Sequence, residues 1–541
     1  MKVLVIGGVA AGTKVAAKMK RIDRSTEVVL FTKSRDISYA GCGLPYYVGG
    51  VIQDKGQLIV NTPEKFSALT GVEVHTGMEA VSVDRENRLV KVINLTNGEV
   101  SEQSYDKLII ATGASPVRPK VEGLDLANVF FMRTPEDAIA LREVLDGGNI
   151  KRAVVAGGGF IGLEVAENLS RQGVRVSVID IAEHTMPGFD PEIAEYVENH
   201  LADEGIMTFA NTRLEAILGT DKVEKVQTSR KAMKADLVVL ALGIRANTGF
   251  LEDSGINCMP NGTIQVDSQM RTNDENIYAM GDCVSVSNRM TKSPAWSPMG
   301  SSANMEGRLA ANNIFGGTSE YPGVLGTGII HLPGLNAGRT GLTEAEASAA
   351  GYDPVSTLTA MDDKAHYYPG ASVFMIKLTA DRESGKLLGV QCLGKGAVDK
   401  IIDIGVMALS LHAKLSDLEN LDLAYAPPFS TAIHPFSVAV NVLQNKISGE
   451  LQSFTPMEYK QGAAQGYKVI DTSQVPTIEN AAYIDLTKVD GEVEGFGKDE
   501  KLLLVCTKGR RAYLLQNRMR YYGYTNTKVL EGGTTFNGSE F

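Results

Sequence analysis

The chain has 541 residues, of which 43% are hydrophobic and 22% are charged, and its formal net charge at pH 7 is −11. Domains usually contain about 100–200 residues, so this length predicts three or four domains, and the scattered basic residues of an acidic chain argue against nucleic-acid binding. No apolar run approaches the roughly 18 residues of a membrane span and no signal peptide opens the sequence, so we expect a cytoplasmic protein with no membrane partner.

The first predicted elements form a strand–turn–helix–strand unit. Residues 2–6 (KVLVI) form a strand, GGVAAG follows, a helix covers about 10–21, and EVVLFT at 27–32 is the next strand. A glycine turn at the first corner of such a unit is typical of a dinucleotide-binding fold. The unit is irregular, because Val9 stands at the middle glycine position and the neutral Thr32 stands where an acid is expected.

The same plan returns in the second quarter of the chain. A strand at 152–156 leads into GGGFIG, a helix extends to Gln172, and VRVSVID at 174–180 is the next strand. The turn matches G-x-G-x-x-G at Gly157, Gly159 and Gly162. Asp180 closes the second strand, where a carboxylate accepts hydrogen bonds from a ribose 2′-hydroxyl and repels a 2′-phosphate. We therefore expect a second nucleotide-binding fold that prefers NADH, with NADPH as the alternative.

Further strands with glycine corners complete the two folds. YDKLIIATGASP at 105–116 lies between the two units, and ADLVVLALGIRAN at 235–247 echoes it after the second unit. IYAMGDC at 277–283 then places Asp282 at the carboxyl end of another strand. The chain order predicts that the second fold is inserted into the first, with the ATG and GD corners where a flavin would lie.

From about residue 321 the pattern changes to that of an antiparallel sheet. SVFMIKLTA at 372–380 and LLGVQCLG at 387–394 alternate as antiparallel strands do, and helical segments flank them. Residues 446–455 are expected to link this part to a small α/β domain at 451–541. The predicted strands of that domain are 467–472, 481–486 and 501–506, and its helix begins near Arg510.

The cysteines are few and far apart. They stand at positions 42, 258, 283, 392 and 506, and none belongs to a C-x-x-C motif. A disulfide framework or a zinc site is therefore not expected, and no metal is predicted. Each thiol is expected to be either inert or reactive.

Several motifs together resemble a known family. GGVAAG, S-x-x-x-C-G-L-P-Y, ATGASP, GGGFIGLEVAE and YAMGDC, in this order, resemble the pyridine nucleotide–disulfide oxidoreductases over about residues 1–450. The single-cysteine segment SYAGCGLPYY and YAPPFS at 425–430 are similar to the coenzyme A-disulfide reductase branch. The tail resembles a rhodanese domain. The fused arrangement resembles coenzyme A-disulfide reductase–rhodanese proteins, also described as NADH-dependent persulfide or polysulfide reductases.

The resemblance implies a fold and two cofactors. The fold would be α/β, with two nested Rossmann-like dinucleotide-binding domains, an α+β dimerisation domain and a C-terminal rhodanese-like α/β domain. The implied domains are FAD-binding at 1–114 and 241–320, NAD(P)H-binding at 115–240, dimerisation at 321–450 and rhodanese-like at 451–541. The residues implied for FAD are Gly7, Ala10, Ala11, Gly12, Thr32, Lys33, Ala111, Thr112, Gly113, Gly281, Asp282 and Ala303. Those implied for NADH are Gly157, Gly159, Phe160, Ile161, Gly162, Asp180 and Gly243.

Cys42 is the expected redox thiol. A two-cysteine reductase carries C-x-x-x-x-C, but the second position here is Tyr47, so no disulfide can form across this loop. Cys42 must therefore find its sulfur partner in a substrate, or cycle through sulfenic acid. In the family the matching cysteine lies against the flavin and forms a mixed disulfide with coenzyme A. By that resemblance NADH would reduce FAD, and the flavin would reduce a Cys42–S–S–R adduct and free the thiol.

Two tyrosines match family positions that assist the leaving thiolate. In a homodimer of the family they come from the partner subunit, and a tyrosine can donate a hydrogen bond without adding charge. The matching residues are Tyr367 in HYYPG, with Tyr368 as its neighbour, and Tyr425 in YAPPFS. The alternative interpretation is that they are interface aromatics.

Coenzyme A is anionic and needs cations, which the first helix supplies. Lys18 and Arg21 resemble family positions that meet its phosphates, Lys14 lies on the same helix, and Ser38 also matches a family contact. The chain departs from the family at Gly41, where asparagine is common, and at 433–434, where Ile-His replaces Lys-Asp. A polysulfide or a glutathione-type persulfide is therefore an alternative substrate.

Cys506 is the second candidate thiol. It ends a strand in KLLLVCTKGRRA, so the loop C-T-K-G-R-R would wrap its backbone N–H groups round the sulfur before a helix begins. The helix N-terminus, Lys508, Arg510 and Arg511 would lower the pKa of the thiol and attract an anionic sulfur donor. C-x-x-x-x-R, with LEGG at 530–533, resembles rhodanese, so Cys506 would carry a persulfide with Arg511 in its catalytic loop.

Alternatives remain open at this stage. The D-x-R of rhodanese is reduced to 471–473 (Asp-Thr-Ser), so the tail is either catalytic or a decayed domain that helps assembly. The flavoenzyme is either a sulfur reductase or an NADH oxidase or peroxidase that cycles through Cys42 sulfenic acid. The whole chain is otherwise mainly a sulfurtransferase or sulfur-binding protein. Cys506 is expected to relay sulfur to Cys42, while Cys258 lies in a loop and Cys283 and Cys392 are packed.

Overall fold

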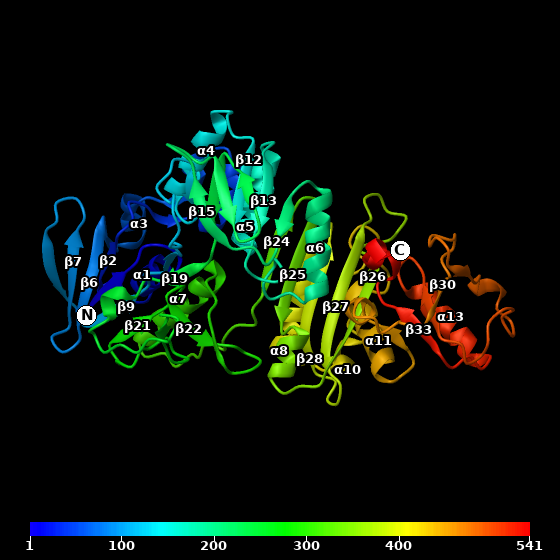
Figure 1. The fold of residues 1–541 in the computed structure, drawn as a ribbon. Coiled ribbons are helices and arrows are strands. Elements are labelled where there is room, and N and C mark those ends of the chain that lie inside the picture. The colour runs from blue at the N-terminus through cyan, green and yellow to red at the C-terminus, as the bar shows by residue number, and fades with distance from the viewer. Residues whose placement is uncertain (541) are drawn as a thin grey trace. The chain divides into compact units, whose positions relative to one another are not determined.

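The computed structural model describes residues 1–540, which form two compact units (Figure 1). Unit 1 contains residues 1–185 and 202–324, and unit 2 contains residues 186–201 together with the chain from 325 onward. Phe541, the last residue of the expected rhodanese-like domain, lies outside the described residues.

The first sheet of unit 1 is parallel and has the strand order β21-β9-β1-β2-β5. Its strands are β1 (Lys2–Ile6), β2 (Glu27–Thr32), β5 (Glu73–Thr76), β9 (Lys107–Ile110) and β21 (Ile277–Ala279), and the helices α1 (Ala10–Ile22) and α7 (Gly300–Ile314) pack together beside it. Because β21 comes from a segment more than 160 residues after β9, this sheet is completed only after the second fold. The predicted insertion of the second fold into the first is therefore confirmed.

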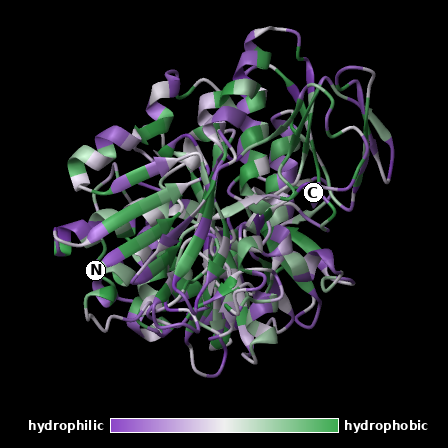
Figure 2. Cartoon of the chain, turned by 90° about the vertical axis from the view of Figure 1, so that its left-hand side faces the viewer, coloured by the Kyte–Doolittle hydropathy of each residue, from purple (hydrophilic) through white to green (hydrophobic). Residues whose placement is uncertain are grey.

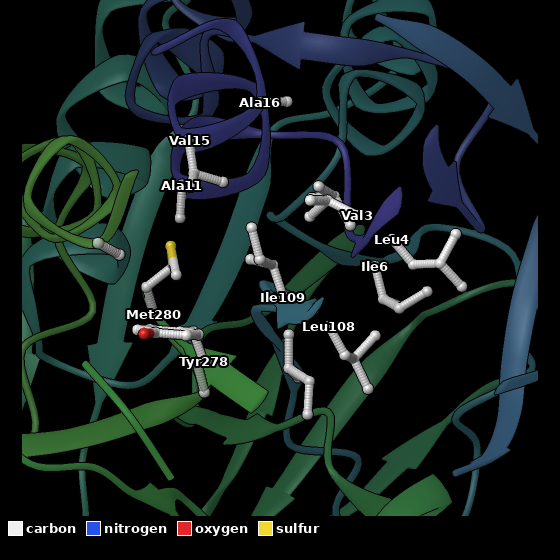
Figure 3. Close-up of a cluster of buried hydrophobic side chains, with 14 of the residues drawn as sticks. Val3, Leu4, Ile6, Ala11, Val15, Ala16, Leu108, Ile109, Tyr278 and Met280 are labelled. Atoms are coloured by element: carbon white, nitrogen blue, oxygen red, sulfur yellow. The ribbon is translucent and has the colours of Figure 1, made fainter. Parts of the chain in front are cut away.

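The core of this sheet consists of aliphatic strands and a helix with small residues (Figure 3). Strands of a parallel sheet are covered on both faces, so they carry continuous apolar runs instead of an alternating pattern. The labelled side chains are all 5% exposed or less and come from β1 (Val3, Leu4, Ile6), α1 (Ala11, Val15, Ala16), β9 (Leu108, Ile109) and the segment around β21 (Tyr278, Met280).

The second sheet of unit 1 is also parallel, with the order β11-β18-β12-β13-β14. Its strands are β11 (Val129–Phe131), β12 (Arg152–Ala156), β13 (Arg175–Ile179), β14 (Met207–Phe209) and β18 (Leu237–Leu240), and its helices include α4 (Pro135–Asp146) and α5 (Phe160–Arg171). Where the chain passes between the two folds, β10 (Ala114–Pro116) pairs antiparallel with β19 (Ile244–Ala246). Two nested Rossmann-like folds thus make up unit 1.

Smaller elements of unit 1 surround these sheets. They are β3 (Ile37–Tyr39), α2 (Leu44–Val48), β4 (Ile59–Asn61), α3 (Pro63–Thr70), β6 (Met78–Asp84), β7 (Leu89–Asn94), β8 (Val100–Ser104), β15 (Leu214–Leu218), β16 (Lys225–Thr228), β17 (Ala232–Lys234), β20 (Ile264–Gln265), β22 (Val284–Ser287) and β23 (Pro294–Ala295).

Unit 2 begins with an antiparallel sheet of order β24-β25-β28-β27-β26. Its strands are β24 (Gly328–Leu332), β25 (Leu335–Gly341), β26 (Pro354–Asp362), β27 (Val373–Asp381) and β28 (Leu387–Gly394). The helices are α8 (Glu344–Ala349), α9 (Val398–Ser410), α10 (Leu415–Leu418) and α11 (Pro435–Ile447), and α6 (Pro191–Asp203) contributes its residues up to 201. This is the predicted α+β part of the chain.

The C-terminal region, residues 451–540, has a parallel sheet of order β29-β33-β32-β30-β31. Its strands are β29 (Ser453–Phe454), β30 (Lys468–Asp471), β31 (Ala482–Tyr483), β32 (Leu502–Val505) and β33 (Thr527–Leu530), and its helices are α12 (Pro456–Lys460), α13 (Arg510–Tyr521) and α14 (Gly533–Asn537). The expected linker at 446–455 is too long, because both of its ends belong to regular elements. Helix α11 continues to Ile447, Leu451 is buried in the core, and β29 pairs with β33.

The hydropathy of the chain follows this architecture (Figure 2). Hydrophobic colour runs along the interior strands, while hydrophilic colour marks many outer helix faces and loops. Within residues 1–540, none of the helices has both the length and the apolar composition that a membrane crossing requires.

Candidate active site

The first glycine turn holds α1 close to the end of β1. Gly7 has φ +115°, and a Cβ there would lie 2.0 Å from the carbonyl oxygen of Ala111. A Cβ on Gly12 would lie 1.8 Å from the carbonyl oxygen of Gly7. Side chains are therefore excluded, and the backbone N–H groups at Ala10 and Ala11 begin a helix whose N-terminus suits a phosphate.

The other expected flavin residues gather at the same edge of the sheet. The ATG corner (111–113) follows β9 and the GD corner (281–282) follows β21, and these two strands are neighbours in the sheet. A Cβ on Gly281 would lie 3.0 Å from the Cβ of Ala11 and 3.6 Å from that of Ala303. Because parallel strands bring their carboxyl ends together, the fold assembles one cradle from segments 270 residues apart in sequence.

The cradle fits a flavin dinucleotide at most of the expected positions. Asp282 accepts a hydrogen bond from Arg133 at 2.7 Å, so its carboxylate is held at the GD corner. Thr32 is buried at the end of β2, and Lys33 pairs with Glu79 at 2.8 Å and is largely exposed. The open glycine corners and the placed carboxylate suit a ribityl–pyrophosphate chain, while Thr32 gives no charge to the adenosine ribose.

Two residues of this corner were missed by the sequence analysis. Arg133, which pairs with Asp282, lies in the short segment between β11 and α4 and belongs to no glycine motif. Glu306 on α7 is 1% exposed, and its carboxylate accepts the N–H of Gly281 at 2.7 Å. Burial raises the pKa of Glu306 to about 7. The only sequence signal for Glu306 was a charged residue on an otherwise small and apolar helix face.

The second glycine turn repeats the geometry of the first. A Cβ on Gly157 (φ +116°) would lie 2.1 Å from the carbonyl oxygen of Ala241, and one on Gly162 would lie 1.9 Å from that of Gly157. Gly159 caps α5, which opens with Phe160 and Ile161, and a Cβ on Gly243 would meet no atom within 4 Å.

Asp180 lies beside this turn as expected. Its Oδ2 accepts the N–H of Gly158 at 2.6 Å, and its Oδ1 accepts the N–H of Ala182 at 2.8 Å. A carboxylate has about four lone-pair sites, so acceptor capacity remains for ribose hydroxyls. The turn and its acid thus fit NADH.

Cys42 lies in a short 3₁₀ turn between β3 and α2. Its side chain is exposed, and the described cysteines are all free thiols. The pKa of the Cys42 thiol is raised above its usual value, first by partial desolvation and then by the carboxylates of Glu164 and Asp282, with Arg133 acting in the opposite direction. Tyr47, at the position of a second redox cysteine, is buried. An accessible single thiol therefore stands alone in this loop.

The helix that follows Cys42 is held by the second nucleotide fold. Arg142 of α4 donates to the carbonyl oxygen of Tyr47 at 3.2 Å, and Gln172 donates to that of Gly49 at 2.7 Å. The hydroxyl of Tyr46 donates to Glu164 of α5 at 3.3 Å, and its pKa is raised to about 12, so it stays protonated. The thiol loop is thereby attached to α4 and α5, and the N-terminus of α5 lies at the second glycine turn.

The cations expected for coenzyme A lie along α1. Among the described residues, Lys14, Lys18 and Arg21 form no ion pair with an acidic side chain, so their charges remain available to an anion. Ser38 lies in β3 with φ +50°, and its N–H donates to the carbonyl oxygen of Gly8 at 2.9 Å. Gly41 precedes Cys42 in the 3₁₀ turn and is exposed.

The two predicted tyrosines meet in unit 2. Tyr367 is 67% exposed, Tyr425 is 49% exposed, and the hydroxyl of Tyr425 is hydrogen-bonded to Tyr367, which raises the pKa of Tyr425. Tyr368 is less exposed, at 39%. His434, where the sequence departs from the family, caps α11 by accepting the N–H of Phe436 at 3.2 Å. Burial and Lys400 lower the pKa of His434 to about 4.

Cys506 follows β32 in a loop that backbone hydrogen bonds tie to α14. The thiol residue is 2% exposed and packs in the core of the C-terminal region. Its carbonyl oxygen accepts the N–H of Thr534 at 3.1 Å, and that of Thr507 accepts the N–H of Thr535 at 2.9 Å. Gly509, with φ +82°, caps α13 as the loop C-T-K-G-R-R predicts.

The charges near Cys506 differ from the expectation. Arg511 donates its Nε to the carbonyl oxygen of Thr472 at 2.8 Å and lies 3.8 Å from Asp485, so it positions the neighbouring loop. Lys508 forms an ion pair with Asp362 of β26. Two of the three predicted cations are therefore matched by acidic partners that sequence reasoning did not identify.

Asp471 keeps a structural role although its D-x-R partner is absent. Its carboxylate accepts the N–H groups of Ser473, Thr477 and Ile478 at 2.8, 2.6 and 3.0 Å. These bonds lower the pKa of Asp471 against the opposing effect of burial. The aspartate therefore shapes the loop after β30. Cys258 is exposed, whereas Cys283 and Cys392 are buried as predicted.

The chain matches two family models along most of its length. Residues 1–301 match the pyridine nucleotide-disulphide oxidoreductase model, and residues 332–435 match the dimerisation domain of the same family. A relative from Pyrococcus abyssi, described as "NAD(P)H sulfur oxidoreductase (CoA-dependent)", is 36% identical over 447 residues, which are 82% of this chain and 98% of the relative.

Two further comparisons bear on different parts of the chain. A relative from Methanocaldococcus jannaschii, described as "NADH oxidase", is 34% identical over 83% of this chain and 100% of its own. The solved structure of a NAD-dependent persulfide reductase from A. fulgidus is 34% identical, with a TM-score of 0.94, and covers 99% of this chain and 100% of that chain. The C-terminal region is therefore included in the structural likeness.

Proposed function

The chain belongs to the pyridine nucleotide-disulphide oxidoreductase family, and we propose that it oxidises NADH and reduces coenzyme A disulfide, persulfides or polysulfide at Cys42. It is an FAD- and NAD(P)H-dependent oxidoreductase that acts on sulfur groups. The proposal concerns the residue that performs the chemistry and the substrates that reach it.

One observation carries the proposal. Cys42 is an exposed thiol, and the position of a second redox cysteine is taken by the buried Tyr47. With no second cysteine in the loop, Cys42 completes its cycle either with a sulfur atom of a substrate or through sulfenic acid, and we propose the first. The similarity to a CoA-dependent sulfur oxidoreductase and to a persulfide reductase supports that reading.

The thiol acts by exchange. The Cys42 thiolate attacks one sulfur of R–S–S–R′, the Cys42–S–S–R bond forms, and R′–S⁻ leaves with the electron pair of the broken bond. Bound FAD supplies the electron pair that NADH gives and that sulfur reduction consumes. The open glycine corners would hold these cofactors, with Asp282 near the flavin and Asp180 near the ribose of NADH.

The tyrosine pair is proposed to assist the leaving thiolate. Tyr425 lies against Tyr367, which raises the pKa of Tyr425, and both side chains are well exposed. A neutral phenol donor stabilises a thiolate without the desolvation cost of a second charge. The family dimerisation domain supports a homodimer in which the pair of one subunit serves the thiol of the other.

Cys506 is proposed to carry sulfane sulfur. Helix α13 begins at Arg510, four residues after Cys506, so its N-terminus would stabilise a sulfur anion, and the low exposure of Cys506 limits loss of the bound sulfur to solvent. A separate proposal places the phosphates of coenzyme A on α1, at Lys14, Lys18 and Arg21. These cations have no acidic partner among the described residues.

A side-by-side assay tests the proposal. NADH consumption is measured with coenzyme A disulfide, coenzyme A persulfide, polysulfide and peroxide, together with the thiol or sulfide released per NADH. We expect a sulfur substrate to be preferred, with release matching NADH loss and the flavin bleaching on addition of NADH. Equal turnover of the Cys42→Ser variant on sulfur substrates would exclude the proposal. Release of sulfide without NADH loss would instead favour a sulfurtransferase.

A second candidate is an NADH oxidase or peroxidase that cycles Cys42 through sulfenic acid. The similarity to the relative described as an NADH oxidase favours it. The peroxide arm of the same assay, with oxygen uptake measured without added thiol, decides between the two. The tyrosine pair and the C-terminal region favour the sulfur substrate, because a peroxide needs neither.

A further inference from the structure

The lysine beside Cys506 is neutralised by a residue from another part of unit 2. Lys508 follows Cys506 by two positions in the same loop, and its Nζ lies 2.6 Å from Asp362 Oδ1 with 33% of each side chain exposed. Arg510, the next cation, is exposed and forms no ion pair among the described residues. Two of the three cations of the loop, Lys508 and Arg511, thus face a carboxylate, and Arg510 remains uncompensated among the described residues.

Asp362 is held in place by the strand that carries it. It is the last residue of β26 and is paired in register with Val373 of β27. Further along β26, the N–H of Leu358 donates to Glu531 at 2.8 Å, and Lys446 pairs with Glu531 at 2.7 Å. Figure 1 shows the C-terminal segment beside β26, where α14 contacts the strand. The ion pair therefore belongs to a fixed contact within unit 2.

Sulfur donors differ in the charge that they bring to this loop. Thiosulfate is a dianion, and when a cysteine thiolate attacks its outer sulfur, sulfite leaves and three negative charges share the site. An organic persulfide R–S–SH brings at most one charge, and the thiolate takes its outer sulfur while R–S⁻ leaves. Attraction of a dianion needs uncompensated cations close to the thiol.

We propose that Asp362 determines the choice of sulfur donor at Cys506, because by neutralising Lys508 it makes the site favour an organic persulfide over thiosulfate. The inference rests on the proposed role of Cys506 as a sulfur carrier. In each loading step a Cys506–S–S bond forms and the bond between the outer sulfur and its donor breaks, so no oxidant or reductant is consumed. Asp362 is a positioning residue, since it acts through Lys508 without touching the donor.

The experiment measures the initial rate at which the Cys506 peptide gains one sulfur atom, by mass spectrometry of the full-length protein after digestion. The donors are thiosulfate and the persulfide of 2-mercaptoethanol. We expect Asp362→Asn to raise the thiosulfate rate about three- to tenfold, and Lys508→Met to lower it by a similar factor because Asp362 is then unpaired. The variant with both substitutions should load sulfur from thiosulfate at a rate close to that of wild type. The rate of loading by the organic persulfide should change by less than about twofold in each of these variants.

Matched controls separate this electrostatic effect from loss of structure. Asp353 precedes the other end of β26 and pairs with Arg382 at 3.1 Å on the surface, so Asp353→Asn should leave both rates unchanged. Salt at about 1 M should remove most of the difference between the variants, because screening acts on charge and not on packing.

The outcomes distinguish the inference from the function on which it rests. An unchanged thiosulfate rate in Asp362→Asn, with normal loading by the organic persulfide, overturns the role of Asp362 and leaves Cys506 as a carrier. Absence of loading by either donor in every variant overturns the carrier role itself, and the inference with it.

Discussion

Cys42 and Cys506 both stand in short loops before a helix, yet their surroundings are opposite. Cys42 is exposed and lies near the carboxylates of Glu164 and Asp282, which help to raise its pKa. Cys506 is 2% exposed and packs in the core of the C-terminal region. The difference teaches that a loop–cysteine–helix pattern does not define one chemistry. Exposure permits exchange with a bulky disulfide, whereas enclosure suits the storage of a single sulfur atom.

Removal of the exposed thiol should have the largest effect. Cys42→Ser should lower NADH-dependent reduction of sulfur substrates at least about 1000-fold, because a hydroxyl cannot exchange with a disulfide. Stopped-flow absorbance should show that NADH still bleaches the flavin. Sulfur loading of Cys506 should also persist, which would sharpen the division between the thiols. The control is Cys258→Ser, since Cys258 is also exposed. A turnover close to wild type in Cys42→Ser would break the comparison.

The tyrosine pair should matter next, and only for the exposed thiol. Tyr425→Phe should lower kcat for coenzyme A disulfide about 10- to 100-fold, because the leaving thiolate loses a hydrogen-bond donor, and should leave Cys506 loading unchanged. Steady-state kinetics would show the effect in kcat more than in KM. Tyr368→Phe is the matched control, since Tyr368 neighbours Tyr367 in the same loop. Equal losses in both variants would instead indicate interface packing.

The parts of these sites that sequence could predict are those governed by local backbone geometry. The glycine corners could be predicted from the strand–turn–helix pattern. In that pattern the turn positions, here Gly7 and Gly157, lie too close to a carbonyl oxygen at the end of a neighbouring strand to carry a side chain. The lone thiol of Cys42 could be predicted because Tyr47 occupies the partner position. Both features depend on residues within a few positions of one another.

The parts that sequence missed come from tertiary pairing. Tyr46 meets Glu164 across 118 positions, and Lys508 meets Asp362 across 146. Neither separation matches the short spacings from which side-chain pairs can be predicted in a sequence. The basic residues around Cys506 therefore led to the prediction that Lys508 is an uncompensated cation. The linker at 446–455 failed for a similar reason, because the pairing of β29 with β33 is visible only in the folded sheet.

Removal of the enclosed thiol should have a selective and smaller effect. Cys506→Ser should slow NADH-dependent turnover of persulfide substrates several-fold, because sulfane sulfur must then reach Cys42 directly, while coenzyme A disulfide turnover stays unchanged. The ratio of the two rates in one preparation is the measurement. A ratio equal to that of wild type would mean that the two thiols work independently.

The carboxylates near Cys42 lead to the prediction with the smallest expected effect, a change in the pH at which this thiol reacts. The pKa of Cys42 is raised, first by desolvation and then by the carboxylates, so its thiolate forms at higher pH than that of an unperturbed thiol, and alkylation by iodoacetamide should accelerate later in a pH titration. Glu164→Gln removes one negative charge but keeps an acceptor for Tyr46, so the midpoint should fall. Peptide mass spectrometry follows Cys42 and Cys258 together, and Cys258 should not shift because no charged group perturbs its pKa. A common shift of both would assign the effect to the fold as a whole, whereas a shift of Cys42 alone would show that Glu164 on α5 controls when this thiol becomes a nucleophile.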